Sequence, residues 1–77
     1  MTKTEFIAKL GAELAISPEK LVEAAPLNSF AAWDSMGRMG VVAMLDTELS
    51  VTLPPGALQK CRTVGDLTAL VADKLEP

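Results

Sequence analysis

A short stretch near the middle of the chain, Trp33-Asp34-Ser35-Met36, has residue types that could support covalent chemistry at the start of a helix. Asp34 is a favoured N-cap residue, because its carboxylate can accept hydrogen bonds from the free backbone N–H groups of a first helical turn. The residues from Met36 onward have a helical pattern, which places the Ser35 hydroxyl in that turn. The positive end of the helix dipole would stabilise a phosphodiester on Ser35. Helix capping alone would also account for an Asp-Ser pair.

The surroundings of Ser35 resemble the acyl carrier protein family, in which a Ser preceded by Asp and followed by Leu or Met opens the second long helix. In that family the serine carries 4′-phosphopantetheine. The resemblance runs from the helix predicted at Thr4 to the helix predicted to end near Leu75. It includes the Leu53-Pro54-Pro55 step and the segment Thr63-Val64-Gly65-Asp66-Leu67.

The resemblance implies a function for the site formed by Ser35 and its neighbours Asp34 and Met36. A separate Mg²⁺-dependent phosphopantetheinyl transferase would move the arm of coenzyme A onto Ser35. An acyl-loading ligase or acyltransferase would then place an acyl group on the arm's thiol as a thioester, for partner enzymes of fatty acid, polyketide or related biosynthesis. An aminoacyl or peptidyl carrier of a nonribosomal pathway would share the fold and the serine. An unmodified helical interaction module, in which Ser35 is only part of a cap, is a third alternative.

Two departures from the family pattern bear on partners. Many members have a Gly-rich segment immediately before the Asp-Ser pair, whereas this chain has Phe30-Ala31-Ala32-Trp33. This difference argues against a typical peptidyl carrier. The chain also has fewer of the acidic residues that usually follow the serine, since Gly37, Arg38 and Gly40 occupy this region. We therefore expect docking through apolar contact more than through an acidic patch.

The second long helix is predicted over residues 35 to 49, with a core stripe of Met39, Val42, Leu45 and Leu49. At 100° per residue the opposite face carries Met36, Gly40, Met44 and Thr47. We expect partners to dock on that opposite face through Met36, Gly40 and Met44, with Arg38 near the same end. Burial of the helix on both faces is the alternative.

The remaining segments predict an all-α fold, a small antiparallel four-helix bundle with a short third helix, like that of the acyl carrier family. The first helix is expected over residues 3 to 15 behind a capping box of Thr2 and Glu5, and a single turn follows Ser17-Pro18. The short third helix is expected within residues 54 to 60, and the fourth from Thr63 to Leu75. The residues expected to pin the long connector onto the bundle are Leu21, Val22, Leu27, Phe30 and Trp33.

Composition limits the chemistry available to the chain. Its 77 residues are expected to form a single carrier domain over 1–77, and the start at Met1 without linker tails favours a free-standing carrier. The absence of His and Tyr removes the common catalytic triads and His-based metal sites, so we expect neither intrinsic enzyme activity nor a bound metal. The single cysteine, Cys61, lies between Lys60 and Arg62 and is expected to be a small buried apolar residue rather than a nucleophile.

Charge and hydropathy bear on whether the chain binds nucleic acid or a membrane. A net charge of −3 with scattered Lys and Arg gives no basic footprint for nucleic acid. The longest uncharged apolar run, Val41 to Leu45, is too short to span a bilayer. We therefore expect a cytoplasmic, monomeric protein with no nucleic acid or membrane partner.

Overall fold

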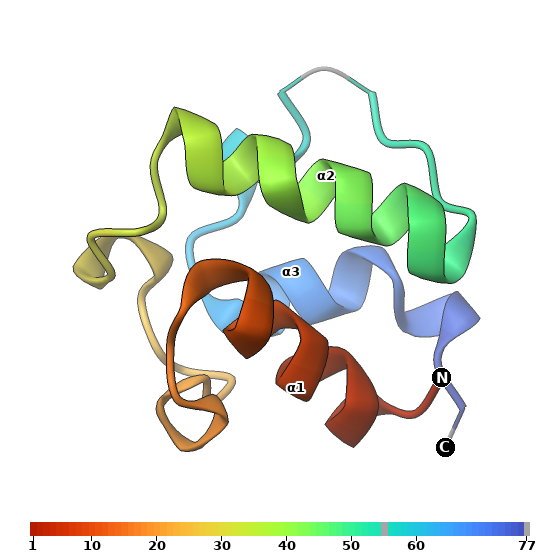
Figure 1. Ribbon diagram of the computed structural model, residues 1–77, viewed down its shortest axis with the longest axis horizontal. Helices are drawn as coiled ribbons and strands as arrows, with labels where there is room; N and C mark the ends of the chain where they lie inside the picture. Colours follow the sequence, from red (N-terminus) through yellow and green to blue (C-terminus); the bar gives the residue numbers. More distant parts are fainter. Residues whose placement is uncertain (55, 77) are drawn as a thin grey trace.

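A computed structural model describes residues 1–54 and 56–76 of the chain. These residues form three α-helices, α1 (Lys3–Leu14), α2 (Ser35–Leu49) and α3 (Val64–Leu70). The part of the chain that is described contains no strand, only two isolated bridges, Thr2 with Glu76 and Pro26 with Thr63. Figure 1 shows α2 lying above α1 and α3 in the view, with α1 and α2 running in opposite directions and the two termini close together. The all-α prediction is confirmed, but the fold has three α-helices where four were expected.

Helix α1 begins where the sequence predicts. The Thr2 side chain accepts from the Glu5 backbone N–H at 3.2 Å, and the Glu5 carboxylate accepts from the Thr2 N–H at 2.9 Å, which completes the capping box. The hydrogen bond from the Thr2 N–H, together with the Thr2 hydroxyl, lowers the pKa of Glu5 below its ordinary value. The helix ends at Ala15, which adopts a left-handed conformation with φ 56°. Its buried face consists of Phe6, Leu10, Gly11 and Leu14.

The long connector between α1 and α2 contains two 3-10 turns, η1 (Pro18–Lys20) and η2 (Leu27–Ser29). The first of these is the turn predicted after Ser17-Pro18. Three backbone hydrogen bonds fix the connector to the segment at the start of α3. They run from Leu27 N–H to Arg62 O at 2.8 Å, from Val64 N–H to Ala25 O at 3.0 Å, and from Gly65 N–H to Glu23 O at 2.9 Å. Leu21 and Leu27 are buried as expected, whereas Val22 is 57% exposed and does not pin the connector.

The expected third helix is reduced to a 3-10 turn, η3 (Leu58–Lys60). Part of the segment predicted for it, Pro55, lies outside the described residues. Gly56 has φ 83°, a backbone conformation that cannot continue a right-handed helix. The turn nevertheless buries Leu58, so it still contributes to the core.

The fourth predicted helix is present as α3, which is shorter than expected. Thr63 and Asp66 form a capping box at its start, and the helix ends before Val71, whose φ and ψ are −119° and 13°. A 3-10 turn, η4 (Ala72–Lys74), continues the chain. Leu70 is 39% exposed, while Thr68 is buried and donates its hydroxyl proton to Val64 O at 3.0 Å.

The three helices, the connector and η3 enclose one apolar core. Its fully buried large side chains are Phe6, Leu10, Leu27, Val41, Leu45, Val64, Leu67 and Val71. Every helix and the connector contribute to this set, so the core fixes α2 against the rest of the chain. None of the helices in the described ranges has the length and apolar character needed to cross a bilayer.

Candidate functional site

Asp34 and Ser35 form the N-terminus of α2 as the sequence predicts. Asp34 has extended backbone angles, φ −124° and ψ −170°, and its carboxylate accepts from the Gly37 N–H at 2.9 Å. Its own carbonyl accepts from the Arg38 N–H at 2.9 Å and begins the helical bonding. Ser35 is the first residue of α2 and is exposed. The predicted N-cap is therefore confirmed, and the Ser35 hydroxyl lies in the first turn, accessible from solvent.

The segment before Ser35 holds the helix N-terminus in place. Phe30, Ala32 and Trp33 are partly buried and pack against the core. Backbone bonds tighten the segment into a turn, from Trp33 N–H to Phe30 O at 3.0 Å and from Asp34 N–H to Ala32 O at 2.9 Å. Packing and backbone hydrogen bonds thus hold the segment before Ser35 against the core.

The inward face of α2 differs from the stripe predicted from sequence. Val41 and Leu45 are fully buried, whereas Met39 is 70% exposed and Val42 is 40% exposed. The prediction that Met39 and Val42 belong to the core is wrong. Helix α2 is apolar on both faces, so the spacing of its apolar residues alone did not identify the face that packs against α1.

The four residues predicted to form a docking surface do not share one face. Met36 is 81% exposed and Arg38 is partly exposed near it. Met44 is partly buried and packs against the core. A Cβ on Gly40 would lie 2.3 Å from Glu13 Oε1, so this glycine faces α1. The structure therefore brings Met36 and Arg38 near Ser35 and turns Gly40 and Met44 inward.

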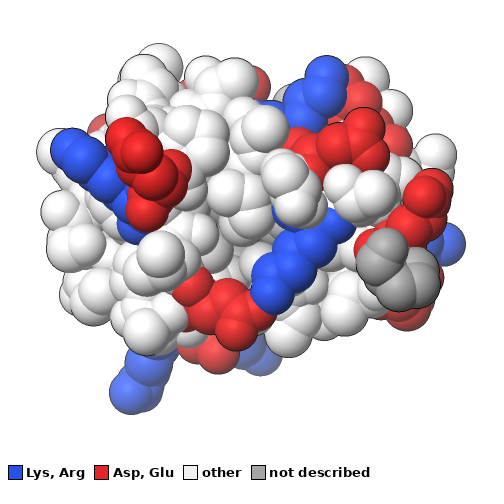
Figure 2. All heavy atoms as spheres, turned by 90° about the horizontal axis from the view of Figure 1, so that it is seen from below, with Lys and Arg blue, Asp and Glu red and all other residues white. Residues whose placement is uncertain are grey.

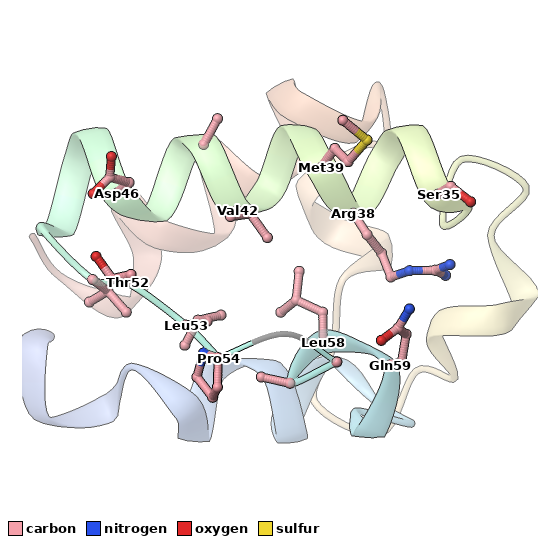
Figure 3. Close-up of a pocket in the computed structure, with 14 residues that line it drawn as sticks. Ser35, Arg38, Met39, Val42, Asp46, Thr52, Leu53, Pro54, Leu58 and Gln59 are labelled. Atoms are coloured by element: carbon pink, nitrogen blue, oxygen red, sulfur yellow. The ribbon is translucent and has the colours of Figure 1, made fainter.

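The outward face of α2 borders a groove that the sequence did not reveal. The groove has a volume of about 620 Å³ and lies between α2 and the irregular segment that follows it. Figure 3 shows Val42 and Leu58 pointing toward each other across it, with Ser35 at one end of the helix and Asp46 near the other. Most of its lining is apolar. The one available signal was the stretch from Val51 to Leu58, rich in apolar residues and proline but without a helical pattern.

Charge on the surface is mixed. Figure 2 shows one face of the molecule, on which acidic and basic side chains alternate among uncharged ones without forming a patch of one sign. Within the described ranges three ion pairs occur, from the Met1 amino group to Glu76, from Lys3 to Glu23 and from Lys9 to Glu48. All three lie away from the first turn of α2.

Cys61 is unsuited to act as a nucleophile. It lies at the edge of the core with 9% of its surface exposed, and its thiol donates weakly to Ala57 O at 3.7 Å. Burial, together with the negative charge of Asp66, raises the pKa of the thiol above its ordinary value. The prediction of a buried apolar cysteine is confirmed, and the flanking Lys60 and Arg62 do not produce a thiolate.

Comparison with known proteins places this geometry in a family. Residues 5–71 match the family described as phosphopantetheine attachment site. The matched residues include the whole of α2 and the turn before it. No curated protein matches the chain at a significant level. The family is defined by the covalent attachment of 4′-phosphopantetheine, and the exposed hydroxyl at a capped helix N-terminus suits such a group. The chain belongs to this family of phosphopantetheine-binding carrier proteins.

Proposed function

We propose that Ser35 carries the 4′-phosphopantetheine arm and that the chain presents an acyl group, bound to the arm as a thioester, to biosynthetic enzymes. The observation that carries the proposal is the exposed Ser35 hydroxyl at the N-terminus of α2, directly after the Asp34 cap and within the matched residues. The arm supplies the thiol that bears the acyl group. The protein supplies a fixed attachment point and the surfaces that partners recognise.

The first turn of α2 suits the attachment reaction. The Ser35 oxygen forms a bond to the phosphorus of the pantetheine phosphate of coenzyme A, and adenosine 3′,5′-bisphosphate leaves. The hydroxyl proton passes to a base of the Mg²⁺-dependent transferase. The product is a phosphodiester with one negative charge, which the helix dipole stabilises at this end of α2.

The groove supports an acyl cargo over an aminoacyl or peptidyl one. Its described lining contains two charged residues, Arg38 and Asp46, while the rest is mostly apolar. Burial of an apolar acyl chain along this surface would be favourable, because the chain would leave water. Burial of the charged ammonium group of an aminoacyl or peptidyl cargo would be unfavourable, because the group would lose its hydration. We infer a carrier for fatty acid, polyketide or related biosynthesis, monomeric, cytoplasmic and without enzyme activity of its own.

Partner enzymes are expected to approach the end of α2 that bears Ser35. Met36 and Met39 are 81% and 70% exposed there, and methionine adapts its shape to different surfaces. The partners are the phosphopantetheinyl transferase, an acyl-loading ligase or acyltransferase, and the enzymes that act on the cargo. We therefore propose a docking surface of Met36, Met39 and Arg38. Gly40 and Met44, which were expected there from sequence, are left out because they face inward.

Loading tests the attachment site. Wild type, Ser35→Ala and Ser29→Ala are incubated with coenzyme A and a broad-specificity transferase, and intact mass is measured. Wild type and Ser29→Ala should gain one phosphopantetheine group, because Ser29 is exposed but lies in η2, away from the helix N-terminus. Ser35→Ala should gain none. Gain of the group by a folded Ser35→Ala protein would show that another residue is modified.

The cargo needs a second measurement. Protein purified from its own host is analysed by intact mass before and after neutral hydroxylamine, which cleaves thioesters. An acyl mass lost on treatment would support the proposal, and an aminoacyl mass would favour the nonribosomal alternative. Cys61→Ala should keep the cargo, because the thioester is proposed to lie on the arm's thiol.

A further inference from the structure

Arg38 lies three residues after Ser35 on α2, and residues at this spacing are neighbours on a helix surface. Both side chains line the same groove. Long side chains on a helix lean toward its N-terminus, and Figure 3 shows the Arg38 side chain turning toward the end of α2 that bears Ser35. A second pocket, of about 580 Å³, is lined by Arg38 together with Trp33, which agrees with this orientation.

The Arg38 guanidinium has no carboxylate partner among the described residues, since it takes part in none of their three ion pairs. The nearest acidic side chain along the helix, Asp34, uses its Oδ1 to cap Gly37. The other charged residue in the described lining of the groove is Asp46, eight residues further along α2, or about 12 Å at 1.5 Å per residue. A positive charge thus lies beside Ser35 without forming an ion pair with a carboxylate of the described residues.

The arm brings such a negative charge to this place. A phosphodiester on Ser35 has two non-bridging oxygens that share one charge, and a guanidinium presents N–H donors in a planar fork that matches two oxygens. Arg38 is only partly exposed and lines the groove.

We propose that Arg38 is a positioning residue for the arm, and that its guanidinium donates hydrogen bonds to the phosphodiester on Ser35. The inference rests on the proposed attachment at Ser35. Held in this way, the first atoms of the arm leave α2 on the side of the groove. A lysine at this position would supply the charge but not the planar fork. The competing interpretation is that Arg38 pairs with Asp34, four residues earlier on the same helix.

The test compares apo and phosphopantetheinylated forms of wild type, Arg38→Gln, Arg38→Lys and Arg62→Gln. Arg62 is the matched control, because it lines the second pocket but not the groove. Intact mass first establishes that each protein is loaded, and proton–nitrogen NMR spectra establish that each is folded. The readouts are the phosphorus NMR shift of the phosphodiester and the shift of the Arg38 Nε–H group.

We expect loading to move the Arg38 Nε–H resonance of wild type. Arg38→Gln should move the phosphorus resonance toward that of free pantetheine phosphodiester, Arg38→Lys should restore part of the difference, and Arg62→Gln should match wild type. Added salt should move the wild-type phosphorus resonance in the direction of Arg38→Gln, because a partly exposed ion pair is screened.

Other results would overturn the inference. A phosphorus resonance identical in loaded wild type and Arg38→Gln would remove Arg38 from the phosphate, while the attachment at Ser35 would stand. An Arg38 Nε–H resonance that responds to Asp34→Asn in the apo protein and not to loading would establish the pair with Asp34. An equal effect of Arg62→Gln would refute the assignment to Arg38. Failure of wild type to load, seen in the mass alone, would instead refute the proposed function and this inference with it.

Discussion

The carbonyl oxygen of Ala32 occupies the space that a side chain on Gly37 would need, since a Cβ built on Gly37 would lie 1.9 Å from it. The same Cβ would lie 3.2 Å from Leu14 Cδ2 on α1. The turn before Ser35, the first turn of α2 and the end of α1 therefore meet at residue 37, and they can approach this closely because it has no side chain. This contact packs the turn that precedes Ser35 against the first turn of α2.

Gly37→Ala is therefore expected to lower the free energy of unfolding, although alanine favours a helix. The new methyl group collides with backbone, which cannot turn aside, and overpacking of this kind costs about 1–3 kcal/mol. Denaturant midpoints would measure the loss. Trp33, the single tryptophan, lies in the displaced turn, and its fluorescence should change.

Gly40→Ala is the matched control for Gly37→Ala. Its Cβ would meet only the side chain of Glu13, with Oε1 nearest at 2.3 Å, and this flexible side chain can rotate away. The substitution should then raise the free energy of unfolding by up to about 1 kcal/mol through helix propensity. Equal effects of the two substitutions would mean that the contact between Ala32 and Gly37 does not constrain the turn.

Asp34→Ala should destabilise the chain by about 0.5–2 kcal/mol, because the Gly37 N–H loses its partner. Asp34→Asn should keep most of this stability, because an amide oxygen also caps well. Loading rates with the transferase would separate capping from charge. If the alanine variant is as stable as wild type, the Asp34 bond to Gly37 N–H contributes nothing.

The helix starts could be predicted from sequence because capping is local. The bonds that link Thr2 with Glu5, Asp34 with Gly37 and Thr63 with Asp66 each join residues three apart, so the residue types suffice. The same argument located the first turn of α2 and Ser35 within it. The proposed attachment site could therefore be located from sequence, together with the family resemblance.

The face of α2 that packs inward could not be predicted in this way. Methionine or valine occurs on both sides of the helix, and long-range packing against α1 decides that Val41 is buried and Val42 is not. The groove was missed for the same reason, since it depends on where the segment after α2 returns. The third helix was overestimated because Gly56, with φ 83°, interrupts a segment whose composition permits a helix.

Ala15→Gly should stabilise the chain by about 0.5–1 kcal/mol, because a residue with a Cβ is strained in the left-handed region that glycine adopts freely. Ala15 has φ 56° at the end of α1. Ala8→Gly is the control, since Ala8 is exposed within the same helix and the change should cost about 1 kcal/mol. Thermal midpoints that fall in both variants would contradict the left-handed cap.

Asp66 should make the chain less stable in acid. Its carboxylate accepts from the backbone N–H groups of Arg62 and Thr63 at 3.0 and 3.2 Å, and these bonds lower its pKa. A lowered pKa in the folded state means that the stabilisation is complete above the unfolded pKa, about 4, and is lost as the pH falls through the folded value. Asp66→Asn keeps an acceptor that does not titrate. Its unfolding free energy should fall less between pH 5 and pH 2, as measured by denaturant titration, and a slope equal to that of wild type would exclude Asp66 as a source of the acid dependence.

Glutamate substitutions at two methionines of α2 should separate docking from stability. Met44 packs against the core, so Met44→Glu would place a charge in a partly apolar site and should lower the free energy of unfolding by about 1–3 kcal/mol. Met39 is 70% exposed beside the groove, and Met39→Glu should change stability by less than about 0.5 kcal/mol. It should nevertheless weaken binding to the cognate acyl-loading enzyme, because the partner would have to desolvate the new carboxylate on an apolar contact surface. Denaturant midpoints and titration calorimetry with that enzyme would measure the two effects. Unchanged binding by a folded Met39→Glu protein would place the docking surface away from the outward face of α2.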